Sequence, residues 1–242
     1  MQGSWTYRVA RAMGLFVRDS VEWAIACSAP DRPWFETEEF GWVPAVEART
    51  AEIRIELDEA LRGPVPEFRE VSTEQLHIAE GAPWKAYIFF LSGREYKKDT
   101  RACPMTASAL RGIPGMISAF FSILEPGARL KEHRGPYKGV LRYHLALKVP
   151  PRAERCGIKV GGEVRHWTEG RSLIFDDTYA HSAWNESDQT RVVLFVDFMR
   201  RMKGPMAAVN QVMLALFRVS PFVHNMFEKL DQLDRGLPGA KR

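Results

Sequence analysis

Six short apolar or alternating segments between residues 84 and 200 limit this chain to a β-rich core. They read WKAYIFFLSG, ISAFFSILEPG, GVLRYHLALKVP, CGIKVGG, SLIFDD and TRVVLFVDFM, and turn residues such as Glu125-Pro126-Gly127 separate them. Short strands with frequent turn signals are typical of a β-sandwich or a barrel. The sequence therefore predicts a mainly β core that is preceded and followed by helices.

The segments on either side of this core have the pattern of helices. Apolar residues are interspersed among many carboxylates over residues 44–61, and they recur at helical spacing between Val9 and Val21. We expect three parts, which are an N-terminal helical segment over residues 1–75, a β domain over residues 76–202, and C-terminal apolar and basic helices over residues 203–242.

The net charge of +4 is unevenly distributed, because residues 1–75 carry an excess of acidic residues and the rest of the chain is basic. A basic surface can bind nucleic acid, an anionic membrane or acidic small molecules. No Lys/Arg run with interleaved aromatic residues supports the nucleic-acid option. Arg11, Arg18 and Asp19 interrupt the N-terminal apolar segment, which argues against a secretory signal peptide. We therefore expect a cytoplasmic protein that does not bind nucleic acid.

The C-terminal stretch MAAVNQVMLALFRVSPFVHNMF is the most apolar part of the sequence. Asn210, Arg218 and Pro221 interrupt it, so it falls short of the roughly 20 apolar residues that a spanning helix needs. Because basic residues precede it, the segment 204–227 could contact a membrane surface peripherally. The alternative is a helix pair packed on the domain or in a homodimer contact, so the oligomeric state stays open.

Two of the six histidines lie at predicted strand ends. His133 follows one strand, and His181 lies between two others. Strand ends can converge at one barrel mouth, and two imidazoles with a carboxylate form the facial site of non-haem Fe(II) oxygenases. A surface histidine in a loop is the alternative for each of them.

Arg191 shares a strand face with Val193 and Phe195, and this face is otherwise apolar. An arginine buried there needs an anionic partner, because an unpaired buried charge is costly. A guanidinium can bind a carboxylate through two hydrogen bonds. The partner is either an internal carboxylate, from Asp176 or Asp177, or a dicarboxylate ligand such as 2-oxoglutarate.

Arg142 and His144 repeat this pattern in the apolar strand VLRYHLAL. Because they are two residues apart, their side chains leave the strand on the same face. Two polar residues on one face of such a strand indicate that the strand lines a cavity.

The segments HRGPYKGVLRYHLALKVP and EGRSLIFDDTYAHSAWNESDQTRVVLFVDF, preceded by WKAYIFFLSG and IPGMISAFFSILEPG, resemble the aspartyl/asparaginyl β-hydroxylase family. The resemblance covers about residues 65 to 200. It implies a double-stranded β-helix, the jelly-roll or cupin-like core of Fe(II)/2-oxoglutarate oxygenases, in agreement with the barrel predicted above. It also implies that the chain uses Fe(II), 2-oxoglutarate and O2 to hydroxylate a C–H bond.

Carried over by position, the resemblance implies that His133 and His181 are the iron ligands. Ser122 and Arg191 would hold the distal carboxylate of 2-oxoglutarate. His144 would face the carboxylate next to the metal.

The resemblance also implies roles for three charged residues. Arg142 matches an arginine that contacts the anionic side chain of the substrate in the animal peptide hydroxylases. Asp176 and Asp177 belong to the FDD motif, and we expect them to orient the metal-binding histidines or form a turn rather than to bind the metal.

Two further positions bear on the substrate. Gly135 stands where a facial triad has Asp or Glu; the animal peptide hydroxylases also have glycine there, whereas the bacterial lipid A acyl-chain hydroxylases have aspartate. Val140 replaces a second substrate-facing arginine of the animal enzymes. The first expectation is the β-carbon of an aspartyl or asparaginyl side chain in a peptide or amino acid. The alternatives are an acyl chain of lipid A or an aminolipid at the cytoplasmic membrane surface, and a non-catalytic binding domain.

Overall fold

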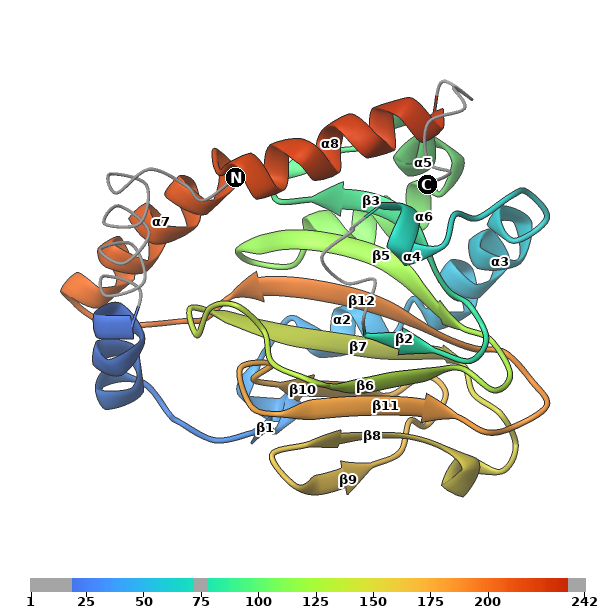
Figure 1. Ribbon diagram of the computed structural model, residues 1–242, viewed down its shortest axis with the longest axis horizontal. Coiled ribbons are helices and arrows are strands. Elements are labelled where there is room, and N and C mark those ends of the chain that lie inside the picture. Colours follow the sequence, from blue (N-terminus) through green and yellow to red (C-terminus); the bar gives the residue numbers. More distant parts are fainter. Residues whose placement is uncertain (1–18, 72–77, 235–242) are drawn as a thin grey trace, which may run out of the picture.

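The computed structural model describes residues 19–71 and 78–234, which form two antiparallel sheets with helices around them (Figure 1). The major sheet has the order β1-β10-β7-β12-β5-β3-β4, and the minor sheet has the order β2-β6-β11-β8-β9. Strands β5 to β12 therefore form the interleaved sets β5-β12-β7-β10 and β6-β11-β8-β9. This order is that of a jelly roll, or double-stranded β-helix. The predicted β core with flanking helices is confirmed.

The strands coincide with the apolar segments of the sequence. The major sheet contains β1 (Trp34–Phe35), β3 (Trp84–Leu91), β4 (Arg94–Glu95), β5 (Met116–Leu124), β7 (Val140–Lys148), β10 (Ser172–Phe175) and β12 (Arg191–Met199). The minor sheet contains β2 (Ala79–Glu80), β6 (Arg129–His133), β8 (Cys156–Val160), β9 (Glu163–Arg165) and β11 (His181–Asn185). The N-terminal segment thus contributes strand β1 to the major sheet as well as helices.

Helices cover the major sheet and one end of the jelly roll. They are the helical residues 19–28, α2 (Val43–Glu47), α3 (Thr50–Ala60), α4 (Phe68–Val71), α5 (Lys97–Ala102), α6 (Pro104–Arg111), α7 (Pro205–Arg218) and α8 (Pro221–Asp234), with 3-10 turns at η1 (Thr37–Glu39) and η3 (Ala153–Arg155). The amphipathic helix expected between Val9 and Val21 falls mostly outside the described residues.

The segment 44–61 forms two helices, where the sequence predicts one. Helix α2 ends at Glu47, and the hydroxyl of Thr50 donates a hydrogen bond to the Glu47 carbonyl at 2.6 Å. Arg49, with φ −93° and ψ 7°, separates this turn from α3. A threonine side chain that bonds to the preceding backbone competes with continuous helical hydrogen bonding, which accounts for the break.

The long strands of the major sheet are buried on both faces. In β12, Val192, Leu194 and Val196 pack with α2, α3 and α6 on the outer face, while Val193 and Phe195 face the interior of the jelly roll. This explains why the sequence shows nearly continuous apolar segments there instead of strict alternation. The polar side chains of interest belong to the interior set.

Within the described residues, no single helix is long and apolar enough to span a membrane. Pro205–Arg218 and Val223–Leu233 reach the required length and hydropathy only together, and they are bent by 49° relative to each other.

Candidate active site

Two histidines face each other across neighbouring strands of the minor sheet. His133 ends β6, His181 begins β11, and the strand register pairs them directly. The centroids of the two imidazole rings are 4.1 Å apart. Each Nδ1 lies close to the carbonyl oxygen of the residue two positions earlier, at 2.7 Å from Lys131 and 3.0 Å from Tyr179. When Nδ1 carries the proton and donates this hydrogen bond, the lone pair is on Nε2. This tautomer can bind a metal through Nε2.

Both histidines are uncharged at neutral pH. Burial lowers the pKa of His133, and burial together with the proximity of His133 and Arg142 lowers the pKa of His181 to about 3. Nε2 of His181 is buried and has no hydrogen-bond partner among the described residues. A pair of neutral imidazoles with an unpartnered nitrogen fits a divalent transition metal such as Fe(II).

Asp177 fills the space beside Gly135, the position at which a facial triad has its carboxylate. A Cβ atom at residue 135 would lie 2.1 Å from Oδ2 of Asp177, and the Gly135 amide donates to the Asp177 carbonyl at 2.7 Å. Oδ1 of Asp177 is buried and unpartnered within the described part of the chain. No three His, Cys, Asp or Glu side chains of that part form a metal-binding group. The histidine pair therefore has a carboxylate near it but no third protein ligand.

Arg191 is buried, and no carboxylate of the described residues pairs with it. Its guanidinium lies 4.5 Å from the ring centroid of Trp167, and Nη1 donates to the Ser122 carbonyl at 3.3 Å. Asp176 instead pairs with Arg200 and Lys138, and Asp177 pairs with Arg142. The alternative that an internal ion pair satisfies Arg191 is therefore wrong.

The surroundings of Arg191 present polar atoms that no described residue satisfies. Nε of Arg191 and both ring nitrogens of His144 are buried without partners. Burial lowers the pKa of Arg191 to about 10, so the guanidinium stays charged at neutral pH. Burial, assisted by Arg191 and Arg142, holds the pKa of His144 well below its usual value, so that imidazole is neutral.

Ser122 completes this group of donors. Its Oγ accepts a hydrogen bond from Nε1 of Trp84 at 2.9 Å, so the hydroxyl proton can be donated elsewhere. Ser122, His144 and Arg191 line one pocket together with His133 and His181. A buried cation, a hydroxyl donor and a neutral imidazole beside a metal site fit a dicarboxylate such as 2-oxoglutarate.

Arg142 lines the same pocket but is fully engaged. Its Nε donates to Oδ1 of Asp197 at 2.9 Å, and Nη2 lies 2.8 Å from Oδ2 of Asp177. Its guanidinium also lies 4.3 Å from the ring centroid of Phe195. Burial would lower the pKa of Arg142, but the two carboxylates raise it; burial raises the pKa of Asp177 to about 6 despite Arg142.

Asp197 was missed by the sequence analysis, although the alternation of β12 places it on the face of Arg191. The register of β12 against β7 pairs Asp197 directly with Arg142.

Asp176 forms the turn that leads to His181. Its Oδ1 accepts hydrogen bonds from the backbone amide of Thr178 at 3.0 Å and from the Thr178 hydroxyl at 2.5 Å. Its Oδ2 pairs with the buried Arg200 and, at 3.4 Å, with Lys138. This arrangement is consistent with the turn-forming role expected of the FDD motif.

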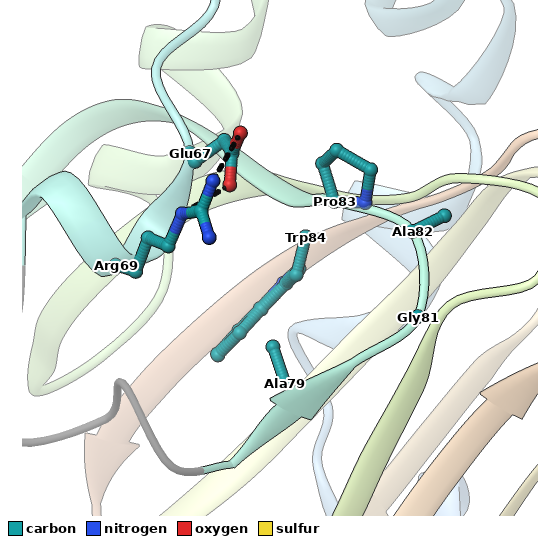
Figure 2. A pocket seen from close by; sticks show the side chains of 7 residues that line it. All are labelled: Glu67, Arg69, Ala79, Gly81, Ala82, Pro83 and Trp84. Carbon is teal, nitrogen blue, oxygen red and sulfur yellow. Dashed lines mark hydrogen bonds and ion pairs between the residues drawn. The ribbon is translucent and has the colours of Figure 1, made fainter.

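Trp84 is a wall residue that the sequence analysis did not single out. It lines the histidine pocket and also a second pocket, which Figure 2 shows beside Ala79 and Pro83. The ring of Phe68 stacks on Trp84 with centroids 4.2 Å apart, which fixes the indole that donates to Ser122. None of the predicted site residues lines the second pocket.

Comparisons with known proteins identify the family of this chain. The profile of the aspartyl/asparaginyl beta-hydroxylase family matches residues 47–201. The ornithine lipid ester-linked acyl 2-hydroxylase of Rhizobium tropici is 40% identical over 219 residues, which cover 88% of this chain and 78% of that protein. The human aspartyl/asparaginyl beta-hydroxylase is 28% identical over 173 residues, which cover 69% of this chain but only 22% of that protein.

Among solved structures, the prolyl-4-hydroxylase of Pseudomonas putida aligns with a TM-score of 0.40 and 15% identity, covering 75% of this chain and 98% of that chain. A predicted oxalate decarboxylase from Thermotoga maritima aligns with a TM-score of 0.35 and 12% identity, covering 50% of this chain and 84% of that chain. The family match over residues 47–201 and the 40% identity to the Rhizobium protein decide the assignment: the chain belongs to the aspartyl/asparaginyl β-hydroxylase family.

Proposed function

We propose that this chain is an Fe(II)- and 2-oxoglutarate-dependent oxygenase that hydroxylates an acyl chain of an aminolipid at the cytoplasmic surface of a membrane. His133 and His181 would hold the iron through Nε2. Ser122 and Arg191 would bind the distal carboxylate of 2-oxoglutarate, and His144 would face its other end. When bound, the iron, 2-oxoglutarate and O2 supply the oxidation of the C–H bond.

The unpaired charge of Arg191 supports the dicarboxylate cosubstrate. A buried guanidinium without an anion is unfavourable by several kcal/mol, on the order of a buried charge that lacks its partner. Arg191 is only 2% exposed, so water does not relieve this cost. Its neighbours Ser122 and His144 add a hydroxyl donor and an uncharged imidazole. The pocket is thus prepared for a carboxylate at this end.

The ion pairs of Arg142 favour an uncharged substrate over an anionic one. Two carboxylates, Asp177 and Asp197, surround this one cation, so the group has a net negative charge when both are ionised. Residue 140, where the family's peptide hydroxylases have a second arginine, is valine. Apart from Arg191, which would hold 2-oxoglutarate, no described residue that lines the pocket offers a cation free to pair with an aspartyl carboxylate, whereas an uncharged acyl chain needs none. The identity to the Rhizobium lipid hydroxylase supports the same choice.

An aspartyl or asparaginyl side chain is the second candidate substrate. Gly135 favours it, because the resemblance associates glycine at this position with the peptide branch of the family. The human peptide hydroxylase is the more distant relative, at 28% identity against 40%. We therefore rank this substrate below the lipid.

The test measures succinate formed from 2-oxoglutarate with Fe(II) and O2, in the presence of either a detergent-dispersed ornithine-type lipid or an aspartyl peptide. We expect the lipid to stimulate turnover and to gain one oxygen atom on its ester-linked acyl chain. His181→Ala should abolish both signals. His224→Ala is the matched control, because His224 is an exposed histidine on α8 that pairs with Glu228 at 3.2 Å.

Each alternative gives a distinct result. Stimulation by the peptide and not by the lipid would overturn the substrate and keep the oxygenase. Full turnover in His181→Ala would overturn the assignment of the iron ligands. If neither substrate stimulates turnover and the wild type also fails to bind Fe(II) and 2-oxoglutarate anaerobically, the chain is a non-catalytic domain.

A further inference from the structure

Apolar side chains are exposed mainly at one end of the molecule. Of the seven large apolar residues that are exposed among the described residues, four are at this end: Trp23, Val212 and Leu216 lie on two helices, and Val219 directly follows α7. Between 59% and 79% of each of these residues is exposed. Figure 1 shows the helix at residues 19–28 and helix α7 together at this end. Such clustering differs from the scattered exposed apolar residues of an ordinary surface.

The exposed residues of α7 form one stripe. With 3.6 residues per turn, Val212 and Leu216 lie on the side of the helix opposite Asn210, and the exposed Val219 continues the stripe directly after the last residue of α7. Asn210 is buried, and its Nδ2 donates to the Gly139 carbonyl at 3.0 Å. The hydroxyl of Tyr137 also donates to Oδ1 of Asn210 at 2.9 Å. Helix α7 therefore packs on the protein through the side that bears Asn210 and Leu214, and its exposed apolar stripe faces outwards.

Helix α7 is attached to the chain segment that directly follows His133. Tyr137 and Gly139 lie in the connection between β6 and β7, which begins directly after His133. The helix at residues 19–28 approaches the same connection: burial, together with the nearby charge of Glu22, raises the pKa of Tyr137 to about 12. The apolar stripe and Trp23 thus flank the segment that leads away from the proposed metal site.

Basic residues border the stripe. Arg201 and Lys203 precede α7, Arg218 ends it, and all three are exposed. None of these three forms an ion pair with another residue of the described chain. An amphipathic helix with an apolar face and basic flanks can lie in the interface of a bilayer, where anionic headgroups attract the basic residues.

We propose that the stripe Val212–Leu216–Val219 and Trp23 form a docking surface for an anionic lipid bilayer. The docked molecule would hold the entrance of its pocket against the membrane, so that an acyl chain reaches the histidines without crossing water. The choice of a bilayer over a second copy of the chain rests on the proposed lipid substrate and on the unpaired basic residues, which would repel a symmetric partner.

Sedimentation of the full chain with vesicles of phosphatidylcholine and phosphatidylglycerol tests this surface. We expect the wild type to bind the vesicles. Leu216→Glu should bind at least about tenfold more weakly, because it removes one apolar side chain that would be buried in the bilayer and adds a negative charge beside anionic headgroups. Binding should also weaken as salt screens the basic residues. The matched control is Ile55→Glu, the same change at a residue of α3 that is 72% exposed; it should bind like the wild type.

The outcomes separate this surface from the proposed function. Equal vesicle binding by Leu216→Glu and the wild type, or no binding by the wild type, overturns the docking surface. A wild-type dimer that Leu216→Glu converts to a monomer, without vesicle binding, identifies a second copy as the partner and also overturns it. Micelle-dispersed lipid should be hydroxylated equally by both proteins. If the wild type binds vesicles but never hydroxylates that lipid, the proposed function fails and the docking surface stands.

Discussion

Arg142 and Arg191 line one pocket, and they differ in whether the chain supplies a carboxylate to each. Arg142 is held by two carboxylates, from Asp177 and Asp197, whereas the described neighbours of Arg191 are a tryptophan ring, a backbone carbonyl and the Cys156 thiol. In the folded chain, carboxylates neutralise the charge of Arg142, whereas no carboxylate of the described residues neutralises the charge of Arg191. A buried arginine therefore indicates a ligand site only when the carboxylates near it are already paired elsewhere.

The largest difference between the two arginines should be in stability. Arg142→Met would leave the Asp177 and Asp197 carboxylates side by side without their cation, and removing one partner of a buried ion pair costs about 3–5 kcal/mol. We expect this loss in the free energy of unfolding, measured with urea. A loss below about 1 kcal/mol would show that the carboxylates do not depend on Arg142.

Arg191→Met should leave stability nearly unchanged but raise the concentration of 2-oxoglutarate that the enzyme needs. Because no internal carboxylate loses its partner, we expect stability to change by less than about 1 kcal/mol. The concentration of 2-oxoglutarate needed for half-maximal succinate formation should rise about 100-fold, as expected for losing about 2–4 kcal/mol of a charged hydrogen bond. If stability falls steeply while this concentration is unchanged, Arg191 is a structural residue and the two arginines are alike.

Asp197→Asn would make Arg142 more like Arg191. One carboxylate is removed while the shape is kept, so stability should fall by about 1–2 kcal/mol. The freed guanidinium should then bind an aspartyl peptide several-fold more tightly than the wild type does. Competition of this peptide with the lipid substrate measures the effect. Identical peptide binding by both proteins would mean that Asp197 does not restrain Arg142.

The smallest expected effect is the pH dependence of stability that comes from His144, whose pKa is lowered by burial and by both arginines. Its pKa in the folded protein is well below 6.5, so only the unfolded chain gains a proton as the pH falls through 6.5. The stability due to the neutral imidazole is complete above that pH and decreases below it, by about 1.4 kcal/mol per pH unit. His144→Gln should therefore lose less stability than the wild type between about pH 6.5 and pH 5.5. Parallel pH profiles would show that His144 titrates normally.

Strand alternation explains which parts of the site the sequence could reveal. His144 and Arg191 are polar residues in apolar strands, and a two-residue period places each on a defined strand face without any knowledge of the structure. Ser122 was predicted from the family resemblance alone. The convergence of His133 and His181 required the topology, since 48 positions separate them in the sequence. The family resemblance supplied that topology.

The remaining features depend on pairings that one strand alone does not show. Asp197 has the right alternation, but its role follows from the register that places it opposite Arg142. Trp84 and Trp167 resemble any buried aromatic residue in the sequence. Their importance comes from what they touch, which are the Ser122 hydroxyl and the Arg191 guanidinium.

The crowding between Gly135 and Asp177 has a consequence for how such sites diversify. Any side chain at residue 135 would collide with the Asp177 carboxylate, whose nearest atom lies 2.1 Å from the position of the new Cβ. A lineage that adds a carboxylate ligand at this position must therefore also move or replace Asp177, and with it a partner of Arg142.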